Sequence, residues 1–397
     1  MSPPSTPALR RDALHLYVHI PFCIHKCAYC DFNSHVRDEP AWDAYRSALL
    51  RELECRAHQE AFTGRRIDTI FFGGGTPSLA PAELIGEVLD DTQRLFTLTD
   101  NAEITLEANP GTIEAGRFSA YRQAGVNRLS IGVQSFKDAE LQWLERIHNA
   151  EQAREAYATA RSAGFDNISL DLMYGLPGQS MSDWLENLQM AIDLSPEHLS
   201  CYQLTIEAHT ELARRHKRSP LALPQDDDAL HLLHNTRKLL LENAYHAYEI
   251  SNFSRPGYAC RHNDAYWLYH DYIGIGAGAA GKWDTAHGGI TRYSNVRSPE
   301  GYIRAVNTHG KAVNSDEQLV LNKAAGEAVW LGLRRSEGLN REGFRLRFRR
   351  DVIDLFGSAL KPWQQSGHLI TTERAIRLSD QGLGLADSIA VSVFSAD

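Results

Sequence analysis

The chain has 397 residues, of which 43% are hydrophobic and 23% charged, and its formal net charge is −9 at pH 7. This length suits one large domain with a smaller one beside it. The composition excludes a disordered or collagen-like chain, the acidic balance argues against nucleic acid as a partner, and no run of about 18 apolar residues could span a bilayer.

The cysteine content and the start of the chain indicate a cellular compartment. Six cysteines are too few for a disulfide scaffold in a chain of this length. Clustered cysteines in a reducing compartment more often bind metal or take part in chemistry. The first residues lack the apolar core of a signal peptide, so we expect a cytoplasmic protein in which residues 1–13 form a flexible leader.

Short β-type runs alternate with helical patterns over the first half of the chain. The helix expected over 181–192 has one apolar face, because its apolar residues recur at helical spacing. Such alternation predicts parallel strands joined by crossover helices. The predicted fold class is therefore α/β, an open (β/α)6 partial TIM barrel. Its six strands are expected at 14–20, 68–73, 102–107, 127–133, 167–173 and 198–204.

Chemistry-bearing segments follow these expected strands. In barrels of this type the functional groups gather at the carboxyl ends of the strands. A cysteine cluster follows the first strand, and Asp171 lies in the fifth. The segments GGGTPS, EANPGT and GVQSF follow the second, third and fourth strands, at 73–78, 107–112 and 132–136. We therefore expect a single site at the mouth of the barrel.

The pattern changes beyond residue 205. A helix is expected over 226–244, followed by the motif RHNDAYW and the glycine-rich run YIGIGAGAAGKWD. Helical patterns with small turns follow from about residue 315. We predict a core barrel at 14–245, a connecting segment at 246–310 and a C-terminal helical, winged-helix-like domain at 311–397.

Three cysteines, Cys23, Cys27 and Cys30, lie in the spacing C-x3-C-x2-C. Three thiolates can hold three irons of a [4Fe–4S] cluster and leave the fourth iron open to a substrate or cofactor. The spacing alone leaves two alternatives: a zinc site completed by a nearby histidine, and a redox pair formed by Cys27 and Cys30. The position of the loop after the first strand of a βα series favours the cluster.

The cysteine spacing and GGGTP, each placed directly after a strand, resemble the radical S-adenosylmethionine (radical SAM) family. The resemblance implies that the open iron binds the amino and carboxylate groups of SAM. It also implies that one electron cleaves the sulfonium to give a 5′-deoxyadenosyl radical, while the protein supplies binding and orientation. Glycines suit this role because they let the backbone approach a small zwitterion.

Further motifs, namely YVHIPFC, EANP, RLSIGVQSF and LDLMYGLPGQ, are similar to those of oxygen-independent coproporphyrinogen III oxidases and their relatives, over roughly residues 14–385. The resemblance implies that Tyr17 and Tyr29 contact SAM near the cluster. It implies that Gly74, Gly75 and Thr76 hold the methionine end of SAM. It also implies that the adenosine and carboxylate sides of SAM are lined by Glu107, Gln134, Arg146 and Asp171.

Two features resemble the HemW-like heme chaperones within this group. Phe32 stands where the oxidases have a fourth cysteine, and RHNDAYW contains the pattern HNxxYW. The resemblance implies heme contacts from His262, Tyr266 and Trp267, because imidazole can ligate heme iron and aromatic rings offer a flat surface to a porphyrin. The alternative for this motif is a surface turn. One departure is Ala280, which replaces the histidine of a GAHGK motif.

The first hypothesis for function is a heme chaperone that carries a SAM-coordinating [4Fe–4S] cluster and delivers heme to respiratory proteins. The alternative is an oxygen-independent coproporphyrinogen III oxidase, which Phe32 disfavours. Whether SAM is cleaved productively is left open, and with it the classification as an enzyme. The expected partners are heme, heme-accepting proteins, a transiently contacted membrane and a second copy of the chain in a cluster-dependent homodimer. A nucleic-acid-modifying protein is disfavoured by the acidic charge.

Overall fold

Six parallel strands form the core of a 12-stranded mixed sheet in the computed structural model, which describes residues 13–112, 115–285 and 289–395. Each strand coincides with one of the six predicted runs, so the open (β/α)6 barrel is confirmed. The predicted leader lies almost entirely outside the described residues. The parallel strands, in their spatial order, are β1 (Ala13–Ile20), β4 (Arg66–Gly74), β5 (Thr97–Ala108), β6 (Arg128–Gln134), β7 (Ile168–Tyr174) and β8 (His198–Gln203).

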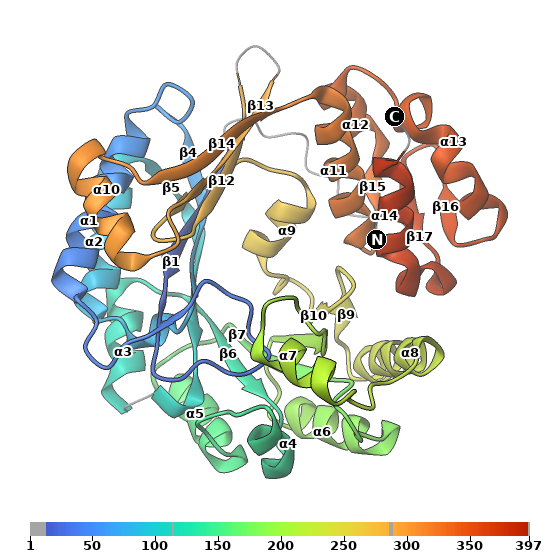
Figure 1. Cartoon of the computed structure of the whole chain (residues 1–397), viewed down its shortest axis with the longest axis horizontal. Helices are drawn as coiled ribbons and strands as arrows, with labels where there is room; N and C mark the ends of the chain where they lie inside the picture. Colours follow the sequence, from blue (N-terminus) through green and yellow to red (C-terminus); the bar gives the residue numbers. More distant parts are fainter. Residues whose placement is uncertain (1–12, 113–114, 286–288, 396–397) are drawn as a thin grey trace.

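Helices cover the outer face of this curved sheet (Figure 1). All except α8 belong to the crossovers that parallel strands require, and α6 matches the predicted helix over 181–192. Its N-terminus is closed by a capping box between Ser180 and Asp183. The helices are α1 (Trp42–Ala57), α2 (Ala82–Leu95), α3 (Ala115–Ala124), α4 (Asp138–Trp143), α5 (Ala150–Ser162), α6 (Met181–Asp193) and, after β8, α8 (Asp226–Glu242).

Strand β1 illustrates how the sequence builds both the core and the site. Successive side chains of a strand point to opposite faces. Its apolar alternate residues are fully buried and join the main hydrophobic core. The residues between them, His15, Tyr17 and His19, form side-chain hydrogen bonds on the inner side of the barrel. One strand thus supplies the core with one face and the barrel interior with the other.

The sheet continues on both sides of the six parallel strands. On one side β11 (Tyr272–Ile275) runs parallel to β1, followed by antiparallel β12 (Ala280–Asp284), β13 (Ile290–Asn295) and β14 (Val313–Leu319). On the other side β8 pairs with β10 (Asn252–Ser254), and β10 with β9 (His246–Ala247). Residues 246–319 therefore share a sheet with the barrel, and the predicted division into domains stays a prediction.

The C-terminal region packs around a separate hydrophobic cluster that includes Phe344, Phe356 and Leu360. Its main helices are α11 (Leu321–Arg334), α12 (Arg341–Phe348), α13 (Val352–Gln365) and α14 (Ala386–Phe394), beside a three-stranded antiparallel sheet of β15 (Leu339–Asn340), β17 (Ala375–Leu378) and β16 (Leu369–Thr371). A helical C-terminal region is thus confirmed, and its likeness to a winged helix stays a prediction. Within the described residues, every helix is too short or too polar to cross a lipid bilayer.

Candidate functional site

The cysteine loop lies at the mouth of the barrel. It begins at β2 (Phe22–Cys23) and ends at β3 (His35–Val36), which pair in parallel and hold the two ends of the loop together. The thiols of Cys23, Cys27 and Cys30 are free and line one cavity of about 480 Å³. Burial raises the pKa of Cys23 and Cys30. Metal binding requires thiolates, so the binding of a metal or cluster to this loop releases protons from its cysteine thiols.

The donor set fits an iron–sulfur cluster better than a single ion. Among the residues that the structure describes, no three His, Cys, Asp or Glu side chains converge to hold one metal ion. A cubane makes a different demand, because each thiolate binds its own iron. Two further donors face the sulfurs: Thr76 Oγ1 lies 3.4 Å from Cys23 Sγ, and Arg146 Nη1 lies 3.6 Å from Cys27 Sγ.

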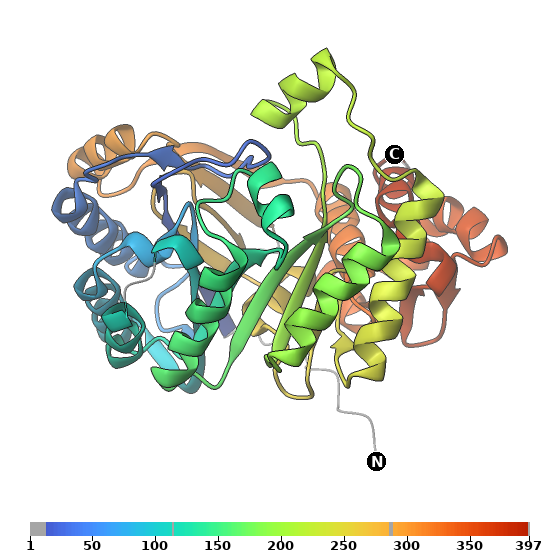
Figure 2. The ribbon, with the colours of Figure 1, turned by 90° about the horizontal axis from the view of Figure 1, so that it is seen from below.

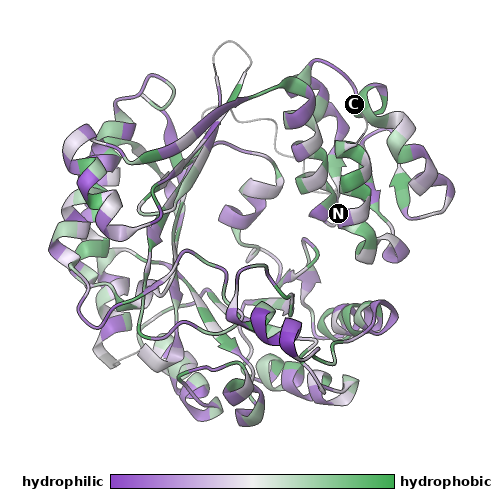
Figure 3. Ribbon diagram, viewed as in Figure 1, coloured by the Kyte–Doolittle hydropathy of each residue, from purple (hydrophilic) through white to green (hydrophobic). Residues whose placement is uncertain are grey.

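A short polar helix, α7 (Glu211–Arg218), packs against the cysteine loop. The backbone N–H of Leu212 donates to the carbonyl of Ala28 over 2.8 Å, and Tyr29 packs against a cluster that contains Leu204 and Leu212. Figure 2 shows α7 projecting from the end of the barrel at which the cysteine loop lies, and Figure 3 shows how hydrophilic α7 is. This support could not be predicted from the sequence, because α7 is far from the cysteine loop along the chain and meets it only in the folded protein.

The glycine segment after β4 lies directly against the cysteine segment. The N–H of Gly75 donates to Ile20 O over 2.8 Å, and the N–H of Thr76 donates to Phe22 O over 2.9 Å. A Cβ on Gly75 would lie 2.7 Å from Phe22 O and 2.9 Å from Cys23 Sγ. The absence of a side chain at Gly75 thus lets this segment pack directly against Cys23, and Gly74, Gly75 and Thr76 line the cavity there.

Two acidic side chains, Glu107 and Asp171, line the cavity. Glu107 Oε2 accepts from the N–H of Gly74 over 3.1 Å. Asp171 accepts from Ser130 over 2.7 Å and from Ser169 over 2.9 Å. Burial, together with the nearby charge of Asp171, raises the pKa of Glu107 to about 8. The site therefore contains a carboxyl group that titrates near neutral pH.

The replacement Glu107→Gln is expected to change the pH dependence of stability. A glutamate in an unfolded chain has a pKa of about 4.3, so the raised folded pKa makes the protonated form favour folding. This contribution is fully present below about pH 4 and is lost as the pH rises through about 8. In urea titrations, the free energy of unfolding of the wild type should fall relative to the variant by roughly 4 kcal/mol between pH 5 and pH 9. The exposed control Glu242→Gln should show no such trend, and a flat difference for Glu107→Gln would contradict the assignment.

Two predicted SAM contacts reach the cavity in ways that only the fold reveals. Arg146 follows α4, and its Nη2 donates to the carbonyl of Gly132 over 2.9 Å, so its guanidinium lies beside β6. Gln134 ends β6 with a φ of 65°, a conformation that non-glycine residues adopt rarely and that often marks functional sites. Both side chains line the 480 Å³ cavity.

Tyr17 and His19 form a hydrogen-bonded pair with a defined direction. His19 Nε2 lies 2.8 Å from the carbonyl of Asn33, which can only accept, so Nε2 carries the proton. Nδ1 therefore accepts from the Tyr17 hydroxyl, 3.0 Å away. Burial lowers the pKa of His19 to about 4, so the pair stays neutral. The lone pairs of the Tyr17 oxygen remain able to accept from a ligand.

The HNxxYW motif forms the helix α9 (Arg261–Trp267), and not a surface turn. His262 is 1% exposed, and both of its ring nitrogens are engaged: Nδ1 lies 2.6 Å from Thr69 Oγ1 and Nε2 lies 3.0 Å from Tyr266 OH. Tyr266 lines the cavity, whereas Trp267 packs under the guanidinium of Arg334, 4.7 Å from its ring centroid. An iron-ligand role for His262 would require one of these two hydrogen bonds to break.

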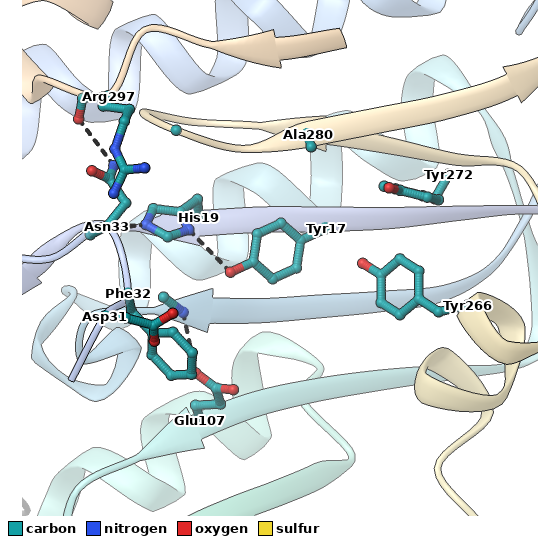
Figure 4. Close-up of a pocket in the computed structure, with 12 residues that line it drawn as sticks. Tyr17, His19, Asp31, Phe32, Asn33, Glu107, Tyr266, Tyr272, Ala280 and Arg297 are labelled. Carbon is teal, nitrogen blue, oxygen red and sulfur yellow. Dashed lines mark hydrogen bonds between the residues drawn. The ribbon is translucent and has the colours of Figure 1, made fainter. Parts of the chain in front are cut away.

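A second cavity of about 360 Å³ adjoins the first and shares Tyr17, Glu107 and Tyr266 with it (Figure 4). Phe32 is 59% exposed and lines both cavities. Ala280 lines the second cavity, with only a methyl group where the resemblance expected an imidazole. The other residues of this cavity were not predicted to contact SAM or heme, although His19 is one of the nearby histidines considered for a zinc site. They are His19, Asp31, Asn33, Tyr272, Gly278 and Arg297.

The structure brings together every predicted site residue except Trp267. The others line the 480 Å³ cavity, although they come from β1, β2, β4, β5, β6 and β7, from the segments that follow these strands and from α9. Their individual roles stay predictions. They are Tyr17, Cys23, Cys27, Tyr29, Cys30, Gly74, Gly75, Thr76, Glu107, Gln134, Arg146, Asp171, His262 and Tyr266.

Comparison with known proteins supports this arrangement. Residues 17–191 match the model of the radical SAM superfamily, and residues 321–385 match that of the HemN C-terminal domain. The chain is 46% identical over 295 residues to the heme chaperone HemW of Haemophilus influenzae, covering 73% of this chain and 76% of that protein. It is 35% identical over 399 residues to the mitochondrial radical S-adenosyl methionine domain-containing protein 1 of Bos taurus, covering 99% and 90%.

The solved structure of the coproporphyrinogen III oxidase HemN from Escherichia coli, a radical SAM enzyme, is also similar. It superposes with a TM-score of 0.81 at 25% identity, covering 96% of this chain and 89% of that one. Membership of the radical SAM superfamily implies a [4Fe–4S] cluster and SAM as cofactors, and the three thiols with the glycine segment packed beside them fit both. From the cysteine loop, the barrel and the extent of the sequence identity, we conclude that the chain belongs to the HemW family of radical SAM proteins.

Proposed function

We propose that this protein is a heme chaperone that binds heme next to a SAM-coordinating [4Fe–4S] cluster and delivers it to heme-dependent respiratory proteins. The observation that carries the proposal is a three-cysteine loop with Phe32 at its end, in a chain 46% identical to a protein named heme chaperone HemW. With an aromatic side chain at this position, the loop offers three thiolates to the cluster.

The cavity suggests how the chain would hold these cofactors. Cys23, Cys27 and Cys30 would bind three irons, and the backbone at Gly74 and Gly75 would bind the methionine end of SAM. When bound and reduced, the cluster supplies the electron that can cleave SAM. The roles of Tyr17, Tyr29, Thr76, Glu107, Gln134, Arg146 and Asp171 would be to orient SAM and to exclude water from it.

Three tyrosines that line the second cavity, Tyr17, Tyr266 and Tyr272, support heme binding there. Tyr266 and Tyr272 pack edge to face, with ring centroids 4.7 Å apart, and Tyr17 lines the same second cavity. Such rings offer apolar surface to a macrocycle and hydroxyl groups to its polar edge. We assign the heme contact of the HNxxYW motif to Tyr266, because His262 has no free ring nitrogen and Trp267 lies outside the cavities.

Delivery requires partners, which we propose on chemical grounds. The acceptors would be heme-requiring respiratory proteins. Contact with a membrane would be transient, and a homodimer would form only while the cluster is present. An acidic chain of this kind has no electrostatic reason to bind nucleic acid.

The second candidate function is oxygen-independent coproporphyrinogen III oxidation, in which propionate side chains lose carbon dioxide. Structural similarity to HemN, with a TM-score of 0.81, favours it. Phe32 disfavours it, because the oxidases carry a cysteine at this position. The two functions differ in outcome: a chaperone returns its tetrapyrrole unchanged, whereas an oxidase converts it.

An anaerobic experiment distinguishes them. The reconstituted protein is incubated with heme, and in a separate reaction with coproporphyrinogen III, SAM and a reductant. We expect heme to bind, to produce a Soret band and to pass to an apo-cytochrome, while coproporphyrinogen III is recovered intact. Formation of protoporphyrinogen would overturn the proposal in favour of the oxidase, and failure to bind heme would overturn it outright.

A further inference from the structure

Arg128 is a buried cation at the closed end of the barrel. It is the first residue of β6, so it lies at the opposite end of that strand from the cysteine loop. Its side chain is 1% exposed, yet it lines the 480 Å³ cavity. A guanidinium group stays charged at any physiological pH and offers five N–H donors. The protein therefore holds a permanent positive charge at the floor of the cavity.

This cation has no direct counter-ion within the described part of the chain. The Nε atom of Arg128 has no hydrogen-bond partner, and none of the ion pairs formed there includes Arg128, unlike Arg56 or Arg161, which pair with carboxylates. The burial of a charge is unfavourable unless the charge is paired and hydrogen-bonded. A cavity-lining arginine in this state has unused capacity for an anion.

The two nearest acidic groups are occupied by other donors. Glu103 accepts from the N–H groups of Arg261 and His262, each over 3.0 Å, and so caps α9. Asp171 accepts from the hydroxyls of two serines, Ser130 and Ser169. Both carboxylates influence Arg128 electrostatically but form no ion pair with it. The thiol of Cys260, also nearby, is neutral at pH 7, because burial raises its pKa to about 12.

We propose that Arg128 binds a carboxylate group of the ligand at the floor of the cavity. Resting on the function proposed above, this carboxylate is a propionate of the porphyrin. Arg–carboxylate pairs are planar and often bidentate, which gives orientation as well as affinity. Asn263 lines the same cavity, and its side-chain amide can complete the hydrogen bonding. Arg128 lies at the end of β6 opposite the metal-binding loop, so the two lie at different ends of the same cavity.

Porphyrin esters test the assignment directly. Heme and its dimethyl ester, which lacks ionisable carboxylates, are titrated against reconstituted wild type, Arg128→Met and Arg128→Lys. The wild type should bind heme about tenfold more tightly than the ester. Arg128→Met should lose this preference for heme and should bind the ester as tightly as the wild type does. Arg128→Lys should keep part of the preference, because it retains the positive charge. The control Arg304→Met removes an exposed arginine of α10 (Pro299–His309) and should behave as wild type. The porphyrin assignment is overturned if Arg128→Met still prefers heme to the ester, or if the wild type shows no preference. It is also overturned if Arg128→Met weakens SAM binding and leaves the preference for heme unchanged.

A measurement without porphyrin separates this site from the proposed function. Thermal unfolding is followed in sodium propionate and in sodium chloride at equal ionic strength. A bound anion stabilises the folded state, so propionate should raise the Tm of the wild type and of Arg304→Met but not that of Arg128→Met. If heme fails to bind while this shift is present, the chaperone proposal fails and the carboxylate site stands. If propionate gives the wild type no greater Tm than chloride, the carboxylate site is overturned. If Arg128→Met does not fold, the carboxylate site is tested instead by the preference of the wild type for heme over the ester and by the reduced preference of Arg128→Lys.

Discussion

Replacing Cys23, Cys27 and Cys30 together by alanine is expected to reduce the iron content of the anaerobically reconstituted protein from about four atoms per chain to nearly none. These three thiols line a single cavity, with Thr76 and Arg146 placed to donate to Cys23 and Cys27. Without thiolates the loop offers no ligand suited to iron–sulfide chemistry. Iron and sulfide assays, together with the absorption band near 400 nm, measure the loss.

A matched control is Cys55→Ala, since Cys55 is a free cysteine on α1, outside both cavities. This variant should retain the iron and sulfide of the wild type. Electron paramagnetic resonance of the reduced wild type should change on addition of SAM, because SAM binds the open iron. A wild-type protein that carries one zinc ion and no sulfide after oxygen-free purification would refute the cluster.

The second large effect is expected from Gly75→Ala, which should weaken SAM binding by roughly 100-fold, or about 2.7 kcal/mol. The added Cβ would lie 2.7 Å from Phe22 O and 2.9 Å from Cys23 Sγ. Both neighbours belong to the short strand that carries the first cluster ligand, so relief of the clash displaces either the glycine backbone or Cys23. Equilibrium binding of SAM to the reconstituted protein measures the effect.

Gly86→Ala provides the control for this substitution. Gly86 lies within α2, and the nearest atom to an added Cβ is 3.8 Å away, in ordinary contact. Alanine also favours a helix over glycine, so this variant should bind SAM as the wild type does and gain about 0.5–1 kcal/mol in stability. Equal SAM affinity of Gly75→Ala and wild type would show that the glycine segment does not hold the cofactor.

Local patterns were sufficient to predict the parallel barrel. The strands β1, β4, β5, β6, β7 and β8 coincide with β-type runs, and α6 coincides with a helical repeat between turn signals. These patterns are local because the burial of one strand face or one helix face depends on residues that are close in sequence. The cysteine spacing is equally local, since the loop that carries all three thiols spans only eight residues.

Distant contacts could not be read from the same patterns. The engagement of both His262 nitrogens depends on Thr69, 193 residues away, and Arg146 meets Cys27 across 119 residues. The sheet also grows beyond the six predicted strands, because β11 pairs with β1 at a separation of about 250 residues. Such pairings are decided by the packing of the whole chain.

The sequence by itself determined the barrel, the three-cysteine loop and the glycine segment that follows β4, because each is encoded by neighbouring residues with a fixed spacing. Only the tertiary structure decided that Tyr266 faces the cavities while Trp267 does not, and that Arg128 lies at the cavity floor with no ion-pair partner among the described residues. The physical reason is that burial and pairing of charged or aromatic side chains depend on which distant elements close over them.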